Sequence, residues 1–516
     1  MADIQSLSDQ IIERTEMLKS KRLNFEKLWQ EVSELVLPRK ADFTVTQTQG
    51  ASRTRRLFET TAVNAAELLA AGLHGMMTNP AGKWFSLTAA NRDKFRDINP
   101  RLAQWLEDAE RIMTEEISRP AAGFATNMHE VYLDLAVLGT AGIYVGWNED
   151  RECLLFQSRF LGELFIDENA AGQVDSVFRV FRWPLEKMVK TWGEDALPDH
   201  LKSRYRHSGR NGDEFEIIHA VMPNPLYRRG TFQKPVTSVY VLKNERHVLF
   251  SGGFEEMPLF VSRWAKASSE VYGRSPAISA LPDIKMLQEM MKETIIAAQL
   301  ANRPPLLVKD DDQFAPVATV PGGIIRYSGE APKAFVSGAN SGVGLDIMNE
   351  IRQRIRMAFF NDQLMTESGV QMTATEVIQR TEEKMRLLGP VAGRLQTELL
   401  GPMIERVFGL LRRHGKIPPP PKSFMNGKSR EVHVAVEYLS PLAMAQKQLE
   451  AQAMVRTLEL ANGFIGMDPE ASAVFNVPEV IRRIGQIYGT GNNFLRSEEE
   501  IKELTRQKGG MDGNDA

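Results

Sequence analysis

Residues 275–303 read SPAISALPDIKMLQEMMKETIIAAQLANR, and this stretch decides the fold. Ser275 and Pro276 are typical of a helix N-cap and its first turn. Pro282 must either kink the helix or mark its true start, and Pro304–Pro305 end it. The apolar side chains that follow lie at helical spacing: Ile284, Leu287, Met291, Ile295 and Ala298.

A compact insert, residues 304–343, follows this helix. It contains two short apolar runs, Leu306–Val308 and Ile324–Tyr327, which prolines and glycines separate. Helix is predicted to resume at residues 344–360, with Arg352, Arg354 and Arg356 around it. The apolar face of this return helix consists of Leu345, Met348, Ile351, Ile355 and Phe359.

The C-terminal part is predicted to be mostly helical. A polar stretch at 361–373 precedes a long helix at 374–413, which Gly389-Pro390 and Gly401-Pro402 interrupt. Pro418–Pro421 should be a stiff connector. A strand at 432–438, three helical segments up to residue 507 and a disordered tail complete the chain.

The N-terminal 270 residues form a mixed block. Helices are predicted at 8–37, 57–77, 99–117 and 127–138, on the spacing of their apolar residues. Six strands with turn residues between them follow: Ile143–Trp147, Leu154–Phe156, Val174–Phe181, Phe215–Val221, Val236–Leu242 and His247–Phe250. The whole chain is therefore expected to be α+β and predominantly helical.

Composition excludes several classes of function. The 516 residues include 63 basic and 66 acidic side chains, a formal charge of −3, which disfavours tight sequence-specific DNA binding. A conduit in which DNA slides is compatible with this balance. The one cysteine, Cys153, cannot form an intrachain disulfide, which fits a reducing compartment such as cytoplasm. No signal peptide and no membrane span are predicted.

Enzymatic motifs are absent or incomplete, so neither a cofactor nor catalytic residues are expected. There is no phosphate-binding loop and no nucleophile elbow, and His129-Glu130 begins a zinc-protease motif that fails at Leu133. The only local carboxylate cluster is Asp310–Asp312, which is more readily explained as a solvated turn than as a metal site. A metal-dependent nuclease or other hydrolase, and a generic capsid scaffolding protein, stay open as alternatives.

The order of a mixed block, a helix, an insert, a return helix, a loop and a long helix resembles the portal proteins, the head-to-tail connectors, of short-tailed bacteriophages. Local sequence resembles them as well. The similar stretches are FETTAVNAAELLAAGLHGMMTNPAGKWFSL (58–87), YGRSPAISALPDIKMLQE (272–289), MTATEV (372–377) and YLSPLAMAQ (438–446). None of them is a catalytic signature.

The resemblance implies a domain order and an assembly. It implies a wing (1–270), a descending stem helix (271–303), a clip (304–343), an ascending stem helix (344–360), a tunnel loop (361–373), a long wing helix with a returning strand (374–440), a helical crown (441–507) and a disordered tail (508–516). It further implies a ring of twelve subunits at one capsid vertex of the virion, assembled in host cytoplasm. Double-stranded DNA would pass through its channel. Its partners would be the terminase large subunit, tail adaptor proteins, and the major capsid and scaffolding proteins.

Candidate site residues follow from this interpretation. The candidates for contact with DNA in the channel are Arg352, Arg354, Arg356, Asn361, Gln363, Thr366, Ser368 and Gln371. Clip candidates facing the motor or the tail are Lys309, Asp310, Asp311, Asp312, Gln313 and Arg326. Subunit-interface candidates are Leu287, Met291, Ile351 and Ile355, because one helix pair with few charges leaves apolar surface for neighbours to bury.

Overall fold

The computed structural model of the chain describes residues 2–46, 48, 50–79, 82–89, 100–208, 212–228, 233–309, 320–327, 330, 341–364, 387–421 and 434–438, and a few positions after 450. The chain divides into two compact units. The first unit comprises Met1–Gly75, Glu116–Ser368 and Gly389–His414, and the second comprises Met76–Glu115, Gly369–Leu388 and Gly415–Ala516.

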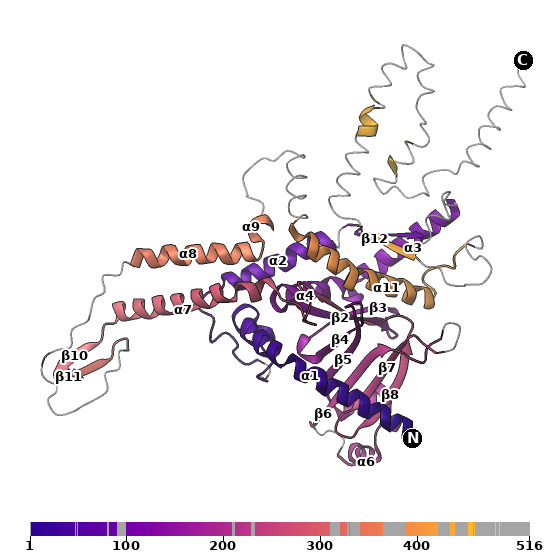
Figure 1. The fold of residues 1–516 in the computed structure, drawn as a ribbon, viewed down its shortest axis with the longest axis horizontal. Helices are drawn as coiled ribbons and strands as arrows, with labels where there is room; N and C mark the ends of the chain where they lie inside the picture. The colour runs from indigo at the N-terminus through magenta and orange to yellow at the C-terminus, as the bar shows by residue number, and fades with distance from the viewer. Residues whose placement is uncertain are drawn as a thin grey trace, which may run out of the picture. The chain divides into compact units, whose positions relative to one another are not determined.

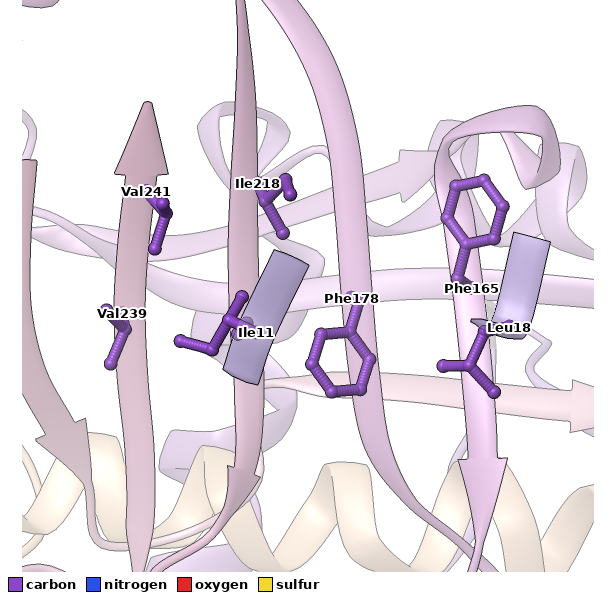
Figure 2. Packing of buried hydrophobic residues seen from close by; sticks show 8 residues of the cluster. Ile11, Leu18, Phe165, Phe178, Ile218, Val239 and Val241 are labelled. Atoms are coloured by element: carbon purple, nitrogen blue, oxygen red, sulfur yellow. The ribbon is translucent and has the colours of Figure 1, made fainter. Parts of the chain in front are cut away.

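A five-stranded antiparallel sheet is the largest sheet of the first unit. Its strand order is β4 (Leu164–Glu168), β5 (Val174–Pro184), β6 (Glu214–Pro223), β7 (Val236–Leu242) and β8 (His247–Phe254). Helix α1 (Ala2–Val36) lies against one face of it (Figure 1). Figure 2 shows Ile11 and Leu18 of α1 packed in one cluster with Phe165, Phe178, Ile218, Val239 and Val241 of the strands.

Alternation along the strands gives this sheet a second apolar face. Ile217 and Leu242, which neighbour Ile218 and Val241 in sequence, belong to a separate cluster because successive side chains of a strand point to opposite faces. Helices α5 (Leu185–Trp192) and α6 (Asp199–Ser208) cover that cluster, with a short 3-10 turn, η5 (Glu194–Ala196), between them.

A three-stranded antiparallel sheet stands beside helix α4 (Phe124–Leu138) in the same unit. Its order is β3 (Cys153–Arg159), β2 (Thr140–Asn148) and β9 (Leu259–Arg263). α4 runs directly into β2 through Gly139, whose φ of +78° ends the helix in the left-handed region. Short 3-10 turns lie at η1 (Pro38–Lys40), η3 (Pro120–Ala122) and η4 (Leu161–Glu163).

Two long helices, α7 (Pro276–Asn302) and α8 (Ser341–Ala358), pack side by side (Figure 1). Ser275 caps α7, as expected, by accepting a hydrogen bond from the Ile278 amide at 3.0 Å. Pro282 lies inside the helix, which therefore starts before this residue. The far ends of the pair lead into β10 (Leu306–Lys309) and β11 (Ile324–Tyr327), which pair in parallel.

After α8, the turn at Phe359–Phe360 leads into a short helix, α9 (Asn361–Leu364). Helix is described again from residue 387. It contains one π-helical turn, η6 (Gln396–Leu400), and continues as α11 (Gly401–Arg413). Helix α2 (Thr61–Met77) begins in the first unit and ends in the second.

In the second unit, strands β1 (Phe85–Ala89) and β12 (Val434–Tyr438) pair antiparallel. The other described element there is most of α3 (Pro100–Ser118). The carboxylate of Glu110, which is 5% exposed, accepts a hydrogen bond from the Leu87 amide at 2.5 Å and pairs with Lys83. This buried carboxylate ties α3 to β1.

The observed chain is a mixed fold of helices and strands, as the sequence indicates. All six strands predicted within the first 270 residues are present, and the two short apolar runs of the insert form β10 and β11. Strands β1, β4 and β9 and helices α5 and α6 were not predicted. The helices expected beyond residue 440 and the tail lie almost entirely outside the described residues.

Candidate functional site

The α7–α8 pair carries all four predicted interface residues and the three candidate arginines. Three of the four proposed interface residues are buried within their own subunit: Leu287 and Ile351 are 1% exposed and Ile355 is fully buried. Met291 is half-buried. The prediction that these side chains are left for neighbouring subunits to bury is therefore wrong for these three residues. They are buried inside the subunit, where α7 packs against α8, α1 and α4.

Apolar side chains that remain exposed lie elsewhere on the same helices. Ile295 and Ile296, on the last turns of α7, are 38% and 37% exposed, and Leu345 and Ile347, on the first turns of α8, are 54% and 42% exposed. We call these four side chains the distal apolar surface. From Thr294 to Asn302, α7 contains no charged residue. Met286 on α7 and Met357 on α8 are exposed as well, at 44% and 55%.

The three candidate arginines differ in their pairing. Arg352 Nε lies 3.2 Å from Glu59 Oε1, and Arg354 Nη2 lies 3.1 Å from Asp283 Oδ1. Arg356 is exposed and has no ion pair among the residues that the structure describes. The charge of Arg352 and Arg354 is thus compensated within the subunit, and Arg356 is the one best suited to contact an external phosphate.

The segment before α2 links α7 to α8. Gln288, 5% exposed, accepts hydrogen bonds from the Phe58 and Glu59 amides at 2.7 and 3.0 Å and donates to the Glu59 carbonyl at 2.7 Å. Glu59 in turn receives the Arg352 guanidinium and the Thr61 amide. Sequence reasoning did not identify Gln288 or Glu59 because their partners lie more than 200 positions away.

The expected loop begins with one helical turn. Asn361 is 5% exposed, and its amide, oriented to satisfy its neighbours, donates to the carbonyls of Phe359 and Ala65 at 3.2 Å each. A buried amide that anchors α9 to α2 does not offer its side chain to DNA, so the prediction for Asn361 is wrong. Gln363 is half-buried. Thr366, Ser368 and Gln371 lie outside the described residues.

The insert residues are described in part. Lys309 on β10 and Arg326 on β11 are both exposed. Asp310, Asp311, Asp312 and Gln313 lie outside the described residues. Leu306 and Ile324 are also exposed, at 62% and 61%, whereas Ile325 is buried.

The described part of the chain offers little for catalysis. No group of three or more His, Cys, Asp or Glu side chains within it could hold a metal ion. An open cavity of about 390 Å³ is lined by Arg39, Lys40, Asp42, Glu130, Ser158, Arg159 and Phe160. Arg39 and Lys40 pair with Glu130 at 2.8 and 2.9 Å, whereas Arg159 forms no ion pair among the described residues. No described helix is long and apolar enough to cross a membrane.

Comparison with known proteins gives the family. The family model described as "Bacteriophage head to tail connecting protein" matches residues 8–495. The chain belongs to this head-to-tail connecting family. The resemblance to portal proteins that the sequence indicated is thereby confirmed, and the connecting family is structural rather than enzymatic.

Two curated relatives agree with this membership. The "Probable portal protein" of Bordetella phage BPP-1 is 30% identical over 96% of this chain and 90% of its own length. The "Portal protein" of Salmonella phage epsilon15 is 26% identical over 97% of this chain and 91% of its own length. A solved structure titled "Neck of empty GTA particle computed with C6 symmetry" matches 77% of this connector and 86% of that chain. The sequence identity is 10% and the TM-score is 0.34, values too low to carry a conclusion about this chain.

Proposed function

We propose that this head-to-tail connector forms a ring of twelve subunits at one capsid vertex, through which double-stranded DNA enters and leaves. The observation that carries the proposal is the distal apolar surface. Its four side chains are each between 37% and 54% exposed in the isolated chain, although α7 and α8 already bury their shared stripe. Neighbouring copies that bury these side chains would gain about 1 kcal/mol or more for each.

The proposed ring is tested by electron microscopy of the purified protein, with class averages viewed down the symmetry axis. Twelvefold averages are expected. Ile347→Asp would place an unpaired carboxylate in the proposed contact, and rings should be lost while the subunit stays folded. Gln353→Asp is the matched control, because Gln353 is exposed on the same helix about 120° away from Ile347. Full rings of the Ile347→Asp protein would contradict the proposed contact.

The polar stretch at 361–373 is proposed to meet DNA in the channel, without Asn361. Gln363, Thr366, Ser368 and Gln371 can hydrogen-bond phosphates without the strong attraction of a lysine row, which suits a sliding duplex. Arg356 adds one cation per subunit before this stretch, and Arg352 and Arg354 add little because they are paired.

Removing Glu367–Gln371 tests the channel role. The deletion spares α9 and its buried Asn361, so rings should form and be visible in the microscope. Packaging or retention of DNA should be impaired. Normal packaging and retention of full-length genomes by the deletion variant would show that this stretch has no channel role.

The insert at 304–343 is proposed to meet the packaging motor, with its terminase large subunit, and later the tail adaptors. Lys309 and Arg326 stand on its two exposed strands, and Asp310–Asp312 and Gln313 complete the candidate set. The mixed block at 1–270 and the helical C-terminal part are proposed as the wing and crown, which would contact the capsid and scaffolding proteins. ATP hydrolysis would belong to the motor, so the purified connector should show no ATPase or nuclease turnover with magnesium.

A further inference from the structure

One arginine of the first unit holds an unusual set of partners. Arg263, the last residue of β9, is 1% exposed. Its backbone amide and Nε donate to Glu398 Oε2 at 2.9 and 3.2 Å, and its Nη2 donates to Glu398 Oε1 at 2.5 Å. Its Nη1 pairs with Glu168, which also binds Lys266 at 2.6 Å. Three donors of one residue thus fix the orientation of one carboxylate.

Glu398 lies in the middle of the π-helical turn Gln396–Leu400. A π turn contains an extra residue compared with an α turn and is rarely stable without specific support. Pro402 contributes to its formation, because its nitrogen cannot donate to the carbonyl four residues earlier, which is that of Glu398. The Arg263 contacts supply the support that selects this turn.

The helix downstream of the π turn is anchored independently. Arg406 Nε donates to the Val145 carbonyl at 2.8 Å, and Arg413 Nη2 lies 2.6 Å from Glu256 Oε2. If the π turn became α-helical, α11 would therefore stay in place. The helical residues upstream of it would rotate by about 100° and shift by about 1.5 Å along the axis.

A strained residue lies near Trp264, the neighbour of Arg263 in sequence. Phe360, in the turn between α8 and α9, has a φ of +57°, a left-handed conformation that a bulky side chain rarely adopts. Its ring lies 6.3 Å from that of Trp264, the residue after Arg263. Movement of α8 that relaxed Phe360 would alter the packing of Trp264 and so reach the arginine.

From these contacts we infer that Arg263, Glu398 and Phe360 form a two-state latch. In the latched state the π turn is held on Arg263. In the released state Glu398 leaves the guanidinium, the turn becomes α-helical and the upstream helix rotates about its axis. A buried ion pair is weak evidence for stability but is well suited to specify one register of a helix.

The latch would couple movement of α8 to the register of the helical residues upstream of the π turn. This consequence rests on the proposed function, because the ring would supply the movement. Of those upstream residues, the structure describes 389–395 in the first unit. Displacement of α8 within the ring would be the signal, transmitted through Phe360 and Trp264.

Hydrogen exchange of the full-length protein, read by mass spectrometry, tests the latch. Glu398→Gln weakens the charge-assisted bonds, and the amides of residues 396–401 should lose about tenfold or more of their protection. Glu256→Gln is the control, because it removes the anchor of Arg413 on the same helix. It should affect residues 406–414 and leave 396–401 unchanged. Protection of 396–401 in Glu398→Gln that equals wild type would overturn the latch.

Coupling to Phe360 gives a second, independent measurement. Phe360→Gly relieves the left-handed strain and removes the ring, and its effect on amides 396–401 should depend on whether Glu398 is present. Independent, multiplicative effects of Phe360→Gly and Glu398→Gln would exclude the coupling. Unchanged hydrogen exchange in β5–β8 confirms that each variant is folded. If exchange rises throughout the Glu398→Gln protein, the Glu398→Asp variant is measured in its place. Electron-microscopy class averages of the ring are recorded separately. If rings form but the exchange results contradict the latch, only this inference is overturned.

Discussion

At the scale of single residues, Gly139 shows how two distant segments are joined. It ends α4 at a φ of +78°, and a Cβ there would lie 2.6 Å from the Arg274 carbonyl carbon and the Gly273 oxygen. Conversely, a Cβ on Gly273 would lie 2.2 Å from the Gly139 oxygen. The two glycines therefore permit a backbone approach that no other residue pair allows, and it places Ser275, the cap of α7, beside α4.

Gly139→Ala should be strongly destabilising. The left-handed φ costs about 1–2 kcal/mol for a residue with a Cβ, and the contact with rigid backbone should raise the total above about 3 kcal/mol. Gly415→Ala is the control, since Gly415, after α11, has a φ of +70° but nothing within 4 Å of its Cβ position. It should cost about 1 kcal/mol. Urea unfolding curves measure both, and equal losses would show that the close approach is not rigid.

His219 should make stability depend on pH. Burial, with Arg179 and Arg159 nearby, lowers the pKa of His219 to about 3, while its ring stacks on Tyr240 at 3.9 Å and contacts Ser238 Oγ at 3.0 Å. The unfolded chain has an ordinary histidine pKa of about 6.5, so it binds the proton first and acid favours unfolding. Stability should fall by about 2 kcal/mol between about pH 6.5 and 5.

The His219→Gln protein provides the comparison for this pH effect. Its stability should change less over the same range, because the substituted side chain does not titrate. Some dependence should remain, since burial also lowers the pKa of His74. Thermal unfolding at several pH values measures both proteins. Identical pH slopes would show that His219 is accessible to protons in the folded chain.

Single residues are also where sequence reasoning has the least information. The apolar spacing of α7 and α8 correctly included the buried Leu287 and Ile351, but it also included Leu345, which is 54% exposed. Whether Ile351 is buried in its own subunit or against a neighbour cannot be read from spacing. Arg263 and Glu398 are 135 positions apart and belong to no motif. A buried ion pair between remote segments leaves no local pattern, so the sequence did not suggest it.

At the scale of elements, Gln288 joins α7 to the segment that starts α2. Gln288→Ala removes three hydrogen bonds and leaves two backbone amides unpaired in a nearly buried place. The loss should be about 2–4 kcal/mol. Gln353→Ala, at an exposed position on the neighbouring helix, should change stability by less than about 0.5 kcal/mol. Chemical denaturation of the two variants measures the difference, and similar midpoints would show that water replaces these bonds.

Elements with regular periodicity were predictable, and those defined by tertiary contacts were not. The alternating strands β5 to β8 were identified, whereas β9, LFVSR, is buried at all five positions and shows no alternation. The interruption expected at Gly401-Pro402 coincides with a π turn rather than a break. The missing amide hydrogen of Pro402 could be read from the sequence, but the Arg263 donors that hold the Glu398 carboxylate could not.

At the scale of the whole molecule, charge and assembly are linked. The chain is nearly neutral, and many of its described charged side chains are paired within the subunit, as Arg352 and Arg354 are. The two compact units are each built from three separate segments, and the boundary at Gly75 falls inside α2. No change in composition marks such a boundary, so the sequence could not predict it.

The proposed ring should therefore resist salt. Ionic contacts between subunits would be screened at about 1 M salt, where the Debye length is about 3 Å, whereas burial of the distal apolar surface does not depend on charge. Sedimentation velocity in about 0.15 M and about 1 M NaCl should give the same ring species. Leu345→Ser, which shortens one exposed apolar side chain without adding charge, should shift both profiles toward subunits equally. Dissociation of the wild-type ring at high salt alone would show that ion pairs, and not Ile295, Ile296, Leu345 and Ile347, dominate the contact between neighbours.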